Sequence, residues 1–203
     1  MSFIDSTYFT GEIAIPGAAS ETTLTQAITQ YEKEILIKLL GYKLYSLLQA
    51  DISGGAPVTQ KYIDLVDGKE YTLTYNGTEY LVKWEGLANT AKQSLIAYYV
   101  FYKYVERNIT SFYGTGVSQA NVQEGWQRVN PASKMVNAWE RMRELYGKIP
   151  PEYKQYYDAP ILGANMSLVY ELSGSAYNFL LTNKTDYLDW VFTPLWNLNQ
   201  FGI

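Results

Sequence analysis

Residues 95–105 read LIAYYVFYKYV and are the most apolar part of this 203-residue chain. At the helical spacing of 3.6 residues per turn, the apolar and aromatic side chains surround almost the whole circumference. A helix of this kind is buried on all sides, so we predict a central helix from Leu87 to about Asn108. The apolar run is far shorter than the ~20 residues that a membrane span needs. It therefore indicates a protein core.

Several helices are predicted before the central one. A capping-box pattern at Thr23 and Gln26 opens the first. Gly41 interrupts it, and a second helix at an angle is expected over 42–50. Pro57 is expected to begin a short helix that runs to about Val66. The first helix carries apolar side chains at helical spacing, namely Leu24, Ala27, Ile28, Tyr31, Ile35 and Leu39.

The segment 70–84 predicts a β-hairpin, because two alternating stretches flank Asn76-Gly77, a pair that favours tight hairpin turns. Further along, Asn130-Pro131 is expected to open a helix that ends at Gly147. One more helix is predicted over 176–192. Residues 110–127 are rich in Gly, Ser, Asn and Gln and are expected to form a long, mobile loop.

The predicted fold is mainly α, a helical bundle with one small β-hairpin and extended N- and C-terminal arms. Residues 1–22 would be the N-terminal arm, with a short strand within residues 3–15. Residues 23–149 would be the helical domain, with the hairpin at 70–84. Residues 150–203 would be a C-terminal extension.

The composition excludes several classes of enzyme. The chain has no histidine and no cysteine, so Ser-His-Asp and Cys-His nucleophiles are impossible, as are metal sites built on imidazole or thiolate. Only carboxylate chemistry, a lysine nucleophile or an all-oxygen cation site remains. The net charge of −4 gives no long-range attraction to phosphate backbones or anionic lipid. We predict a soluble, non-enzymatic protein without metal or cofactor.

Neighbouring carboxylates are the remaining candidates for acid–base chemistry. A glycosidase needs two carboxyl groups that face each other across a cleft. Side chains two apart on a helix point in different directions, and those three apart lie beside each other. We therefore expect solvated helix surfaces or helix caps at the three candidate pairs, Glu32 with Glu34, Asp64 with Asp67, and Asp186 with Asp189.

Cationic side chains have equally ordinary interpretations. Lys92 and Lys103 fall on the predicted central helix and could be desolvated nucleophiles. Snorkelling, or an ion pair with Glu106, is the simpler expectation. Arg141 is expected to pair locally with Glu144 or Glu140.

The C-terminal segment Thr193–Ile203 combines apolar side chains with no charged residue. The nearby aromatic residues Trp190, Phe192, Trp196 and Phe201 either fold back on their own domain or occupy a partner's groove, since exposed apolar surface is normally used. We predict an extended docking arm. Its partner-binding residues would be Leu195, Trp196, Leu198, Phe201 and Ile203, with Phe3, Tyr8 and Phe9 from the N-terminal arm. Phe112, Tyr113 and Val117 would anchor the 110–127 loop in a complex.

Several segments together resemble the small head–tail connector (adaptor, or head-completion) proteins of tailed phages and prophages. They are Phe3–Ile13 (FIDSTYFTGEI), the stretch from Tyr31-Glu32 to Leu39-Leu40-Gly41-Tyr42-Lys43-Leu44-Tyr45, Trp84-x-Gly86-Leu87, Ser94–Val100 and Pro131-x-x-Lys134-Met135-Val136-x-Ala138-Trp139. The resemblance covers most of residues 3–147 and includes the closing FTPLWNxNQFGI from Phe192. Its specificity comes from several motifs coinciding.

The resemblance implies a virion neck protein, assembled in the host bacterial cytoplasm and located at the head–tail junction. It would form a dodecameric ring below the portal protein, contact other neck and tail proteins, and let DNA pass without sequence-specific binding. No membrane partner is implied. The sequence leaves two alternative functions, a carbohydrate-binding module that uses exposed Tyr and Trp and a carboxylate-based hydrolase.

Overall fold

The computed structural model describes residues 2–15, 21–75, 77–108, 110–113, 116–119, 132–147 and 174–195. This part of the chain is mainly α, as the sequence predicts. Its longer elements are α1 (Glu21–Leu40), α2 (Tyr42–Asp51), α3 (Gln60–Asp67), β3 (Lys69–Tyr75), β4 (Thr78–Trp84), α4 (Leu95–Asn108), α5 (Ala132–Tyr146) and α8 (Ala176–Thr182). The short ones are the 3₁₀ helices η1 (Ser6–Tyr8) and η2 (Gly11–Ile13) and the strands β1 (Ile52–Ser53), β2 (Ala56–Pro57), β5 (Thr110–Tyr113) and β6 (Gly116–Gln119).

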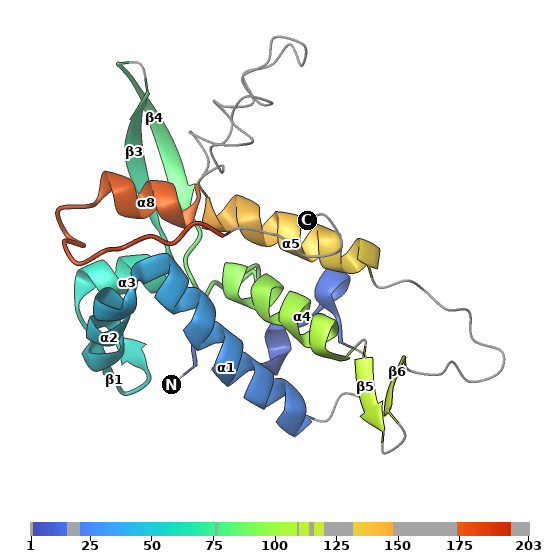
Figure 1. Cartoon of the computed structure of the whole chain (residues 1–203). Helices are drawn as coiled ribbons and strands as arrows, with labels where there is room; N and C mark the ends of the chain where they lie inside the picture. The colour runs from blue at the N-terminus through green and yellow to red at the C-terminus, as the bar shows by residue number, and fades with distance from the viewer. Residues whose placement is uncertain are drawn as a thin grey trace, which may run out of the picture.

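Helix α4 is the centre of the fold, as predicted. It packs against both α1 and α5 (Figure 1). Residues 95–102 are all at most 4% exposed, including the tyrosines of that stretch. The helix nevertheless begins at Leu95 and not at the predicted Leu87. Leu87 and Ala88 donate their backbone N–H groups to the end of α3, which keeps this segment out of the helix.

Helices α1 and α2 confirm the predicted interruption at Gly41. The first helix begins two residues before the predicted capping box, so Thr23 lies inside it and the capping-box prediction is wrong. Its buried face includes Leu36 and Leu40, both 0% exposed. Helix α3 begins at Gln60, after the small β1–β2 ladder, and not at Pro57.

The predicted hairpin is confirmed as β3–β4, with Tyr71 paired to Val82 in its register. It projects from the helices, and α8 crosses its base (Figure 1). Phe179 of α8 packs edge-on against Tyr71, at a centroid distance of 5.5 Å, and stacks on Trp84 at 6.1 Å. The Trp84 indole N–H donates to the carbonyl of Leu65 at 2.9 Å. The hairpin is thus supported from both α3 and α8.

The predicted loop at 110–127 is wrong for the residues described there. Residues 110–113 and 116–119 pair as the antiparallel ladder β5–β6, with Phe112 opposite Val117 and Tyr113 opposite Gly116. The Gly, Ser and Thr content suggested a loop. The aromatic and β-branched residues on either side are good strand formers, however, and a ladder satisfies their backbone groups.

Two further predictions are corrected near the ends of the chain. Residues 2–15 form two 3₁₀ turns and not a strand; Asp5 caps the first by accepting from the backbone N–H of Thr7 at 2.8 Å. The helix predicted over 176–192 ends at Thr182. Asn183 folds back to donate to the Phe179 carbonyl from its side chain, at 2.8 Å, and from its backbone, at 3.1 Å. Within the described ranges, every helix is too short or too polar to span a bilayer.

We predict that Ser94→Ala lowers the free energy of unfolding by about 1–2 kcal/mol. Ser94 is fully buried, accepts from the N–H of Ile96 at 3.1 Å and donates to the Leu87 carbonyl at 2.5 Å. The substitution removes the cap of α4 and leaves a buried carbonyl without its donor. Urea denaturation followed by circular dichroism measures the change. Ser46→Ala, at an exposed hydroxyl, is the matched control; equal effects at both sites would contradict the prediction.

Candidate interaction site

The end of α1 carries backbone carbonyls that the helix itself does not satisfy. Helix α1 stops at Leu40, and Gly41 donates only to the carbonyl of Ile37, at 2.9 Å. The segment 187–193, called the strap below, crosses this helix end and supplies the missing donors. Its hydrogen bonds are Thr193 N–H to the Lys38 carbonyl at 2.9 Å, Trp190 indole N–H to the Leu39 carbonyl at 2.8 Å and Val191 N–H to the Leu40 carbonyl at 3.2 Å.

Gly41 makes this close approach possible. Its φ is +78°, in the left-handed region that favours glycine. A Cβ placed on it would lie 2.9 Å from the Cβ of Val191 and 3.1 Å from the Val191 carbonyl oxygen. Any side chain at position 41 would therefore strain the turn and displace the strap.

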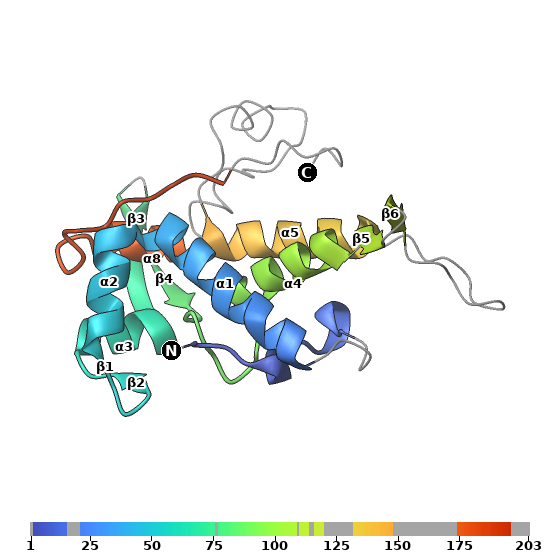
Figure 2. The ribbon, with the colours of Figure 1, turned by 60° about the horizontal axis from the view of Figure 1, so that its bottom comes forward.

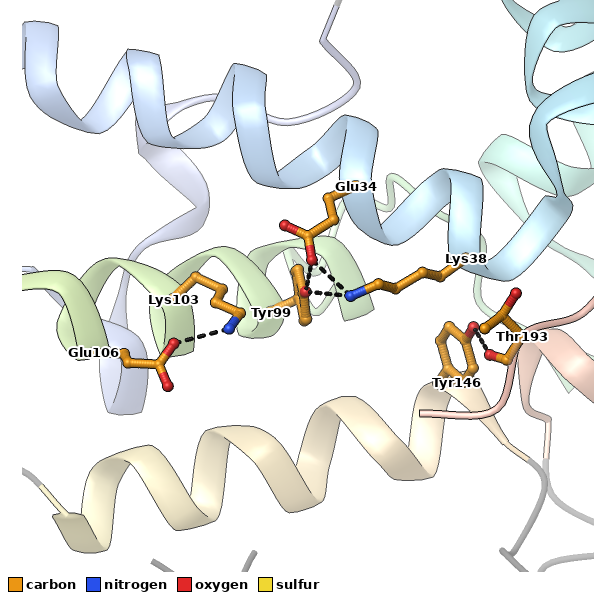
Figure 3. Close-up of polar contacts among 7 residues, drawn as sticks. All are labelled: Glu34, Lys38, Tyr99, Lys103, Glu106, Tyr146 and Thr193. Carbon is orange, nitrogen blue, oxygen red and sulfur yellow. Dashed lines mark hydrogen bonds and ion pairs between the residues drawn. The ribbon is translucent and has the colours of Figure 1, made fainter. Parts of the chain in front are cut away.

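Aromatic side chains hold the end of the strap against α5 and α8. Tyr146 of α5 donates its hydroxyl to the Thr193 carbonyl at 2.7 Å (Figure 3), and its ring lies 5.0 Å from that of Phe192. Tyr177 of α8 packs on Trp190 at 5.5 Å and on Phe192 at 4.7 Å. Burial raises the pKa of Tyr146 well above its ordinary value, so its hydroxyl stays a donor throughout the physiological range.

The strap has an anchored inner side and an exposed apolar outer side. Asp189 forms an ion pair with Lys43 of α2 at 2.6 Å. On either side of Asp189 in the sequence, Leu188 is 81% and Val191 64% exposed, and Tyr42 beside Gly41 is 69% exposed. Exposed apolar side chains mark a contact surface where they form a contiguous patch.

A polar cluster links α1 to α4 at the side of the strap (Figure 3). The Glu34 carboxylate accepts from Lys38 Nζ at 2.6 Å and from the Tyr99 hydroxyl at 2.7 Å. Burial would raise the pKa of Glu34, but these two hydrogen bonds, together with the positive charges of Lys38 and Lys103, hold that pKa below its usual value. Next to the cluster, Lys103 pairs with Glu106 at 2.8 Å, as predicted. The charged groups of the cluster are engaged with one another.

The other charged candidates are placed as follows. Arg141 pairs with Glu144 at 2.7 Å, as predicted. Lys92 lies in the turn before α4 and not on the helix, which corrects its predicted placement. Asp64 pairs with Lys69 at 2.7 Å. In the described part of the chain, no group of acidic residues is arranged to hold a metal ion.

Glu32 is the one carboxylate whose predicted solvated position is wrong. It is 4% exposed and holds the N-terminal arm. It accepts from the Ser2 hydroxyl at 2.6 Å and from the backbone N–H groups of Phe3, at 2.9 Å, and Ile4, at 3.3 Å. Burial raises the pKa of this carboxyl, while the hydrogen bonds from Ser2, Phe3 and Ile4 act in the opposite direction.

The predicted partner-binding residues of the N-terminal arm lie on the chain's own core. Phe9 is 7% exposed, and Phe3 and Tyr8 are partly buried against the same cluster. The Tyr8 hydroxyl also donates to the Asn89 carbonyl at 3.3 Å. Their role in binding a partner stays a prediction, and it would fall to the partly exposed faces of Phe3 and Tyr8.

The remaining predicted contacts lie elsewhere on the molecule. Leu195 is partly buried against the core, directly after the strap. Trp196, Leu198, Phe201 and Ile203 fall outside the described residues. Phe112, Tyr113 and Val117 belong to β5–β6, which lies beyond the end of α4, far from the strap (Figure 1). The predicted contacts that fall within the described ranges therefore do not form one site.

Sequence reasoning missed the strap, although one signal pointed to it. A glycine between two helices with no capping side chain leaves the carbonyls of the first helix in need of donors. The sequence around Gly41 offers none, so a distant segment must supply them. Trp190 and Phe192 were candidates to fold back on the domain, but nothing in their local sequence indicated that they would lie at the end of the first helix.

We predict that Gly41→Ala costs more than about 2 kcal/mol of stability and weakens the strap, because it combines positive-φ strain with overlap on Val191. Gly54→Ala is the matched control, since Gly54 has φ +60° and no atom near a placed Cβ. Thermal unfolding measures the stability, and amide exchange at Val191 and Thr193 reports the strap. Similar losses of stability in the Gly41→Ala and Gly54→Ala variants would show that the overlap with Val191 contributes nothing to the effect.

The raised pKa of Glu32 predicts a dependence of stability on pH. The folded state favours the protonated carboxyl, so this contribution is fully present below the unfolded pKa near 4.5 and is lost as pH rises through the folded pKa. Relative to Glu32→Gln, which does not titrate, the wild type should therefore lose stability as the pH rises from about 4.5 towards neutrality.

The Glu34→Gln variant is a control, because the pH dependence of stability that it removes has the opposite sign. The lowered pKa of Glu34 stabilises the fold above about pH 4.5, and that stability is lost on acidification. Urea titrations of the three proteins across this pH range measure both effects. The same pH slope in the Glu32→Gln variant and the wild type would contradict the prediction.

Comparisons with protein-family models, with curated proteins and with solved structures found no match for this chain. The candidate site is therefore defined by its own geometry. It is a strap fixed to the end of α1, apolar on its outer side, from which the C-terminal residues continue.

Proposed function

We propose that this chain is a structural subunit of the neck of a tailed phage, a connector that forms a ring below the portal protein. In this proposal α1, α4 and α5 are the helical bundle of each subunit, and DNA passes through the centre of the ring. A net charge of −4 suits that passage, because the wall would not retain phosphate backbones.

The observation that carries the proposal is that the strap, from which the C-terminal arm continues, is fixed to the helices. Three backbone carbonyls of α1 and the hydroxyl of Tyr146 hold the strap up to Thr193. Leu195 still touches the core, and the sequence then continues with Trp196, Leu198, Phe201 and Ile203 without any charge. A fixed origin followed by an uncharged apolar arm suits docking into another subunit, because anchoring reduces the entropy lost on binding.

The similarity to connector proteins gains support from a contact between two of its segments. One runs through Leu39-Leu40-Gly41-Tyr42 and the other is the closing stretch from Phe192. Far apart in sequence, they meet where Thr193 donates to the Lys38 carbonyl. The two segments therefore belong to one structural unit, as parts of a shared family pattern would.

The two alternative functions find less support. A carbohydrate-binding module needs a row of exposed aromatic side chains. Trp84 and Trp139 are 1% and 4% exposed, and Tyr98, Tyr99 and Tyr102 lie in the core. A hydrolase needs carboxyl groups that face each other across a cleft. Among the described carboxylates of the predicted pairs, Glu34, Asp64 and Asp189 are bound to lysines, and Glu32 is bound to the N-terminal arm.

We predict that truncation after Leu195 leaves the monomer folded and abolishes assembly. Removing Trp196–Ile203 spares the strap contacts described above, so the melting temperature should stay within about 2 °C of the wild type. Each buried aromatic anchor that is lost should weaken docking by more than tenfold, or at least about 2 kcal/mol. Electron microscopy of the protein mixed with the portal protein of the same phage would show whether rings assemble.

Truncation after Asp186 is the matched comparison. It also removes the strap, so it should lower the melting temperature markedly by uncapping α1. If the shorter truncation, after Leu195, lowers the melting temperature as much, the arm belongs to the subunit's own core. If that variant still assembles with the portal protein, the docking-arm proposal fails.

A further inference from the structure

We draw no further inference here: the strongest candidate, the exposed apolar side chains of Tyr42, Leu188 and Val191 on the surface where the strap crosses the end of α1, carries no proposal because nothing in the described part of the chain shows what covers them.

Discussion

The unsatisfied carbonyls at the end of α1 are the constraint on which much of this structure depends. A helix that stops inside a protein must find donors for its last turn, because buried carbonyls without partners are costly. Here Gly41 turns the chain into α2 before a local cap can form. The donors come from Trp190, Val191 and Thr193. Because Val191 lies so close to the backbone of residue 41, only glycine fits at that position.

Tyrosine side chains make several of the other contacts that join separate elements of the fold. The chain has 20 tyrosines, and several place their rings in the core while their hydroxyls bind a different element. Tyr98 donates to Glu12 of η2 at 2.6 Å, Tyr99 to Glu34 of α1 at 2.7 Å and Tyr146 to Thr193 of the strap. Each of these side chains adds apolar burial and a directional contact between elements. Tyr71 is an exception, since its buried hydroxyl has no hydrogen-bond partner among the residues that the structure describes.

The parts of the fold that the sequence predicted are those set by local pattern. The period of apolar residues placed α4 at the centre, and Asn76-Gly77 identified the β3–β4 hairpin. The parts that it missed depend on groups distant in sequence. Glu32 looks like any solvated helix residue until the arm folds over it, and α8 ends early because Asn183 turns back on Phe179. The candidate site belongs to this second class, because a helix end and the strap that caps it share no local pattern.

The distance along the chain between Leu39 and Trp190 has a consequence for synthesis. The hydrogen bond between them spans 151 residues, so α1 leaves the ribosome long before its cap does. Until the strap emerges, the carbonyls at the end of α1 lack the donors that the strap supplies. Contacts between residues this far apart in sequence form late in folding. The last turn of α1 is therefore capped only after residue 193 has been synthesised.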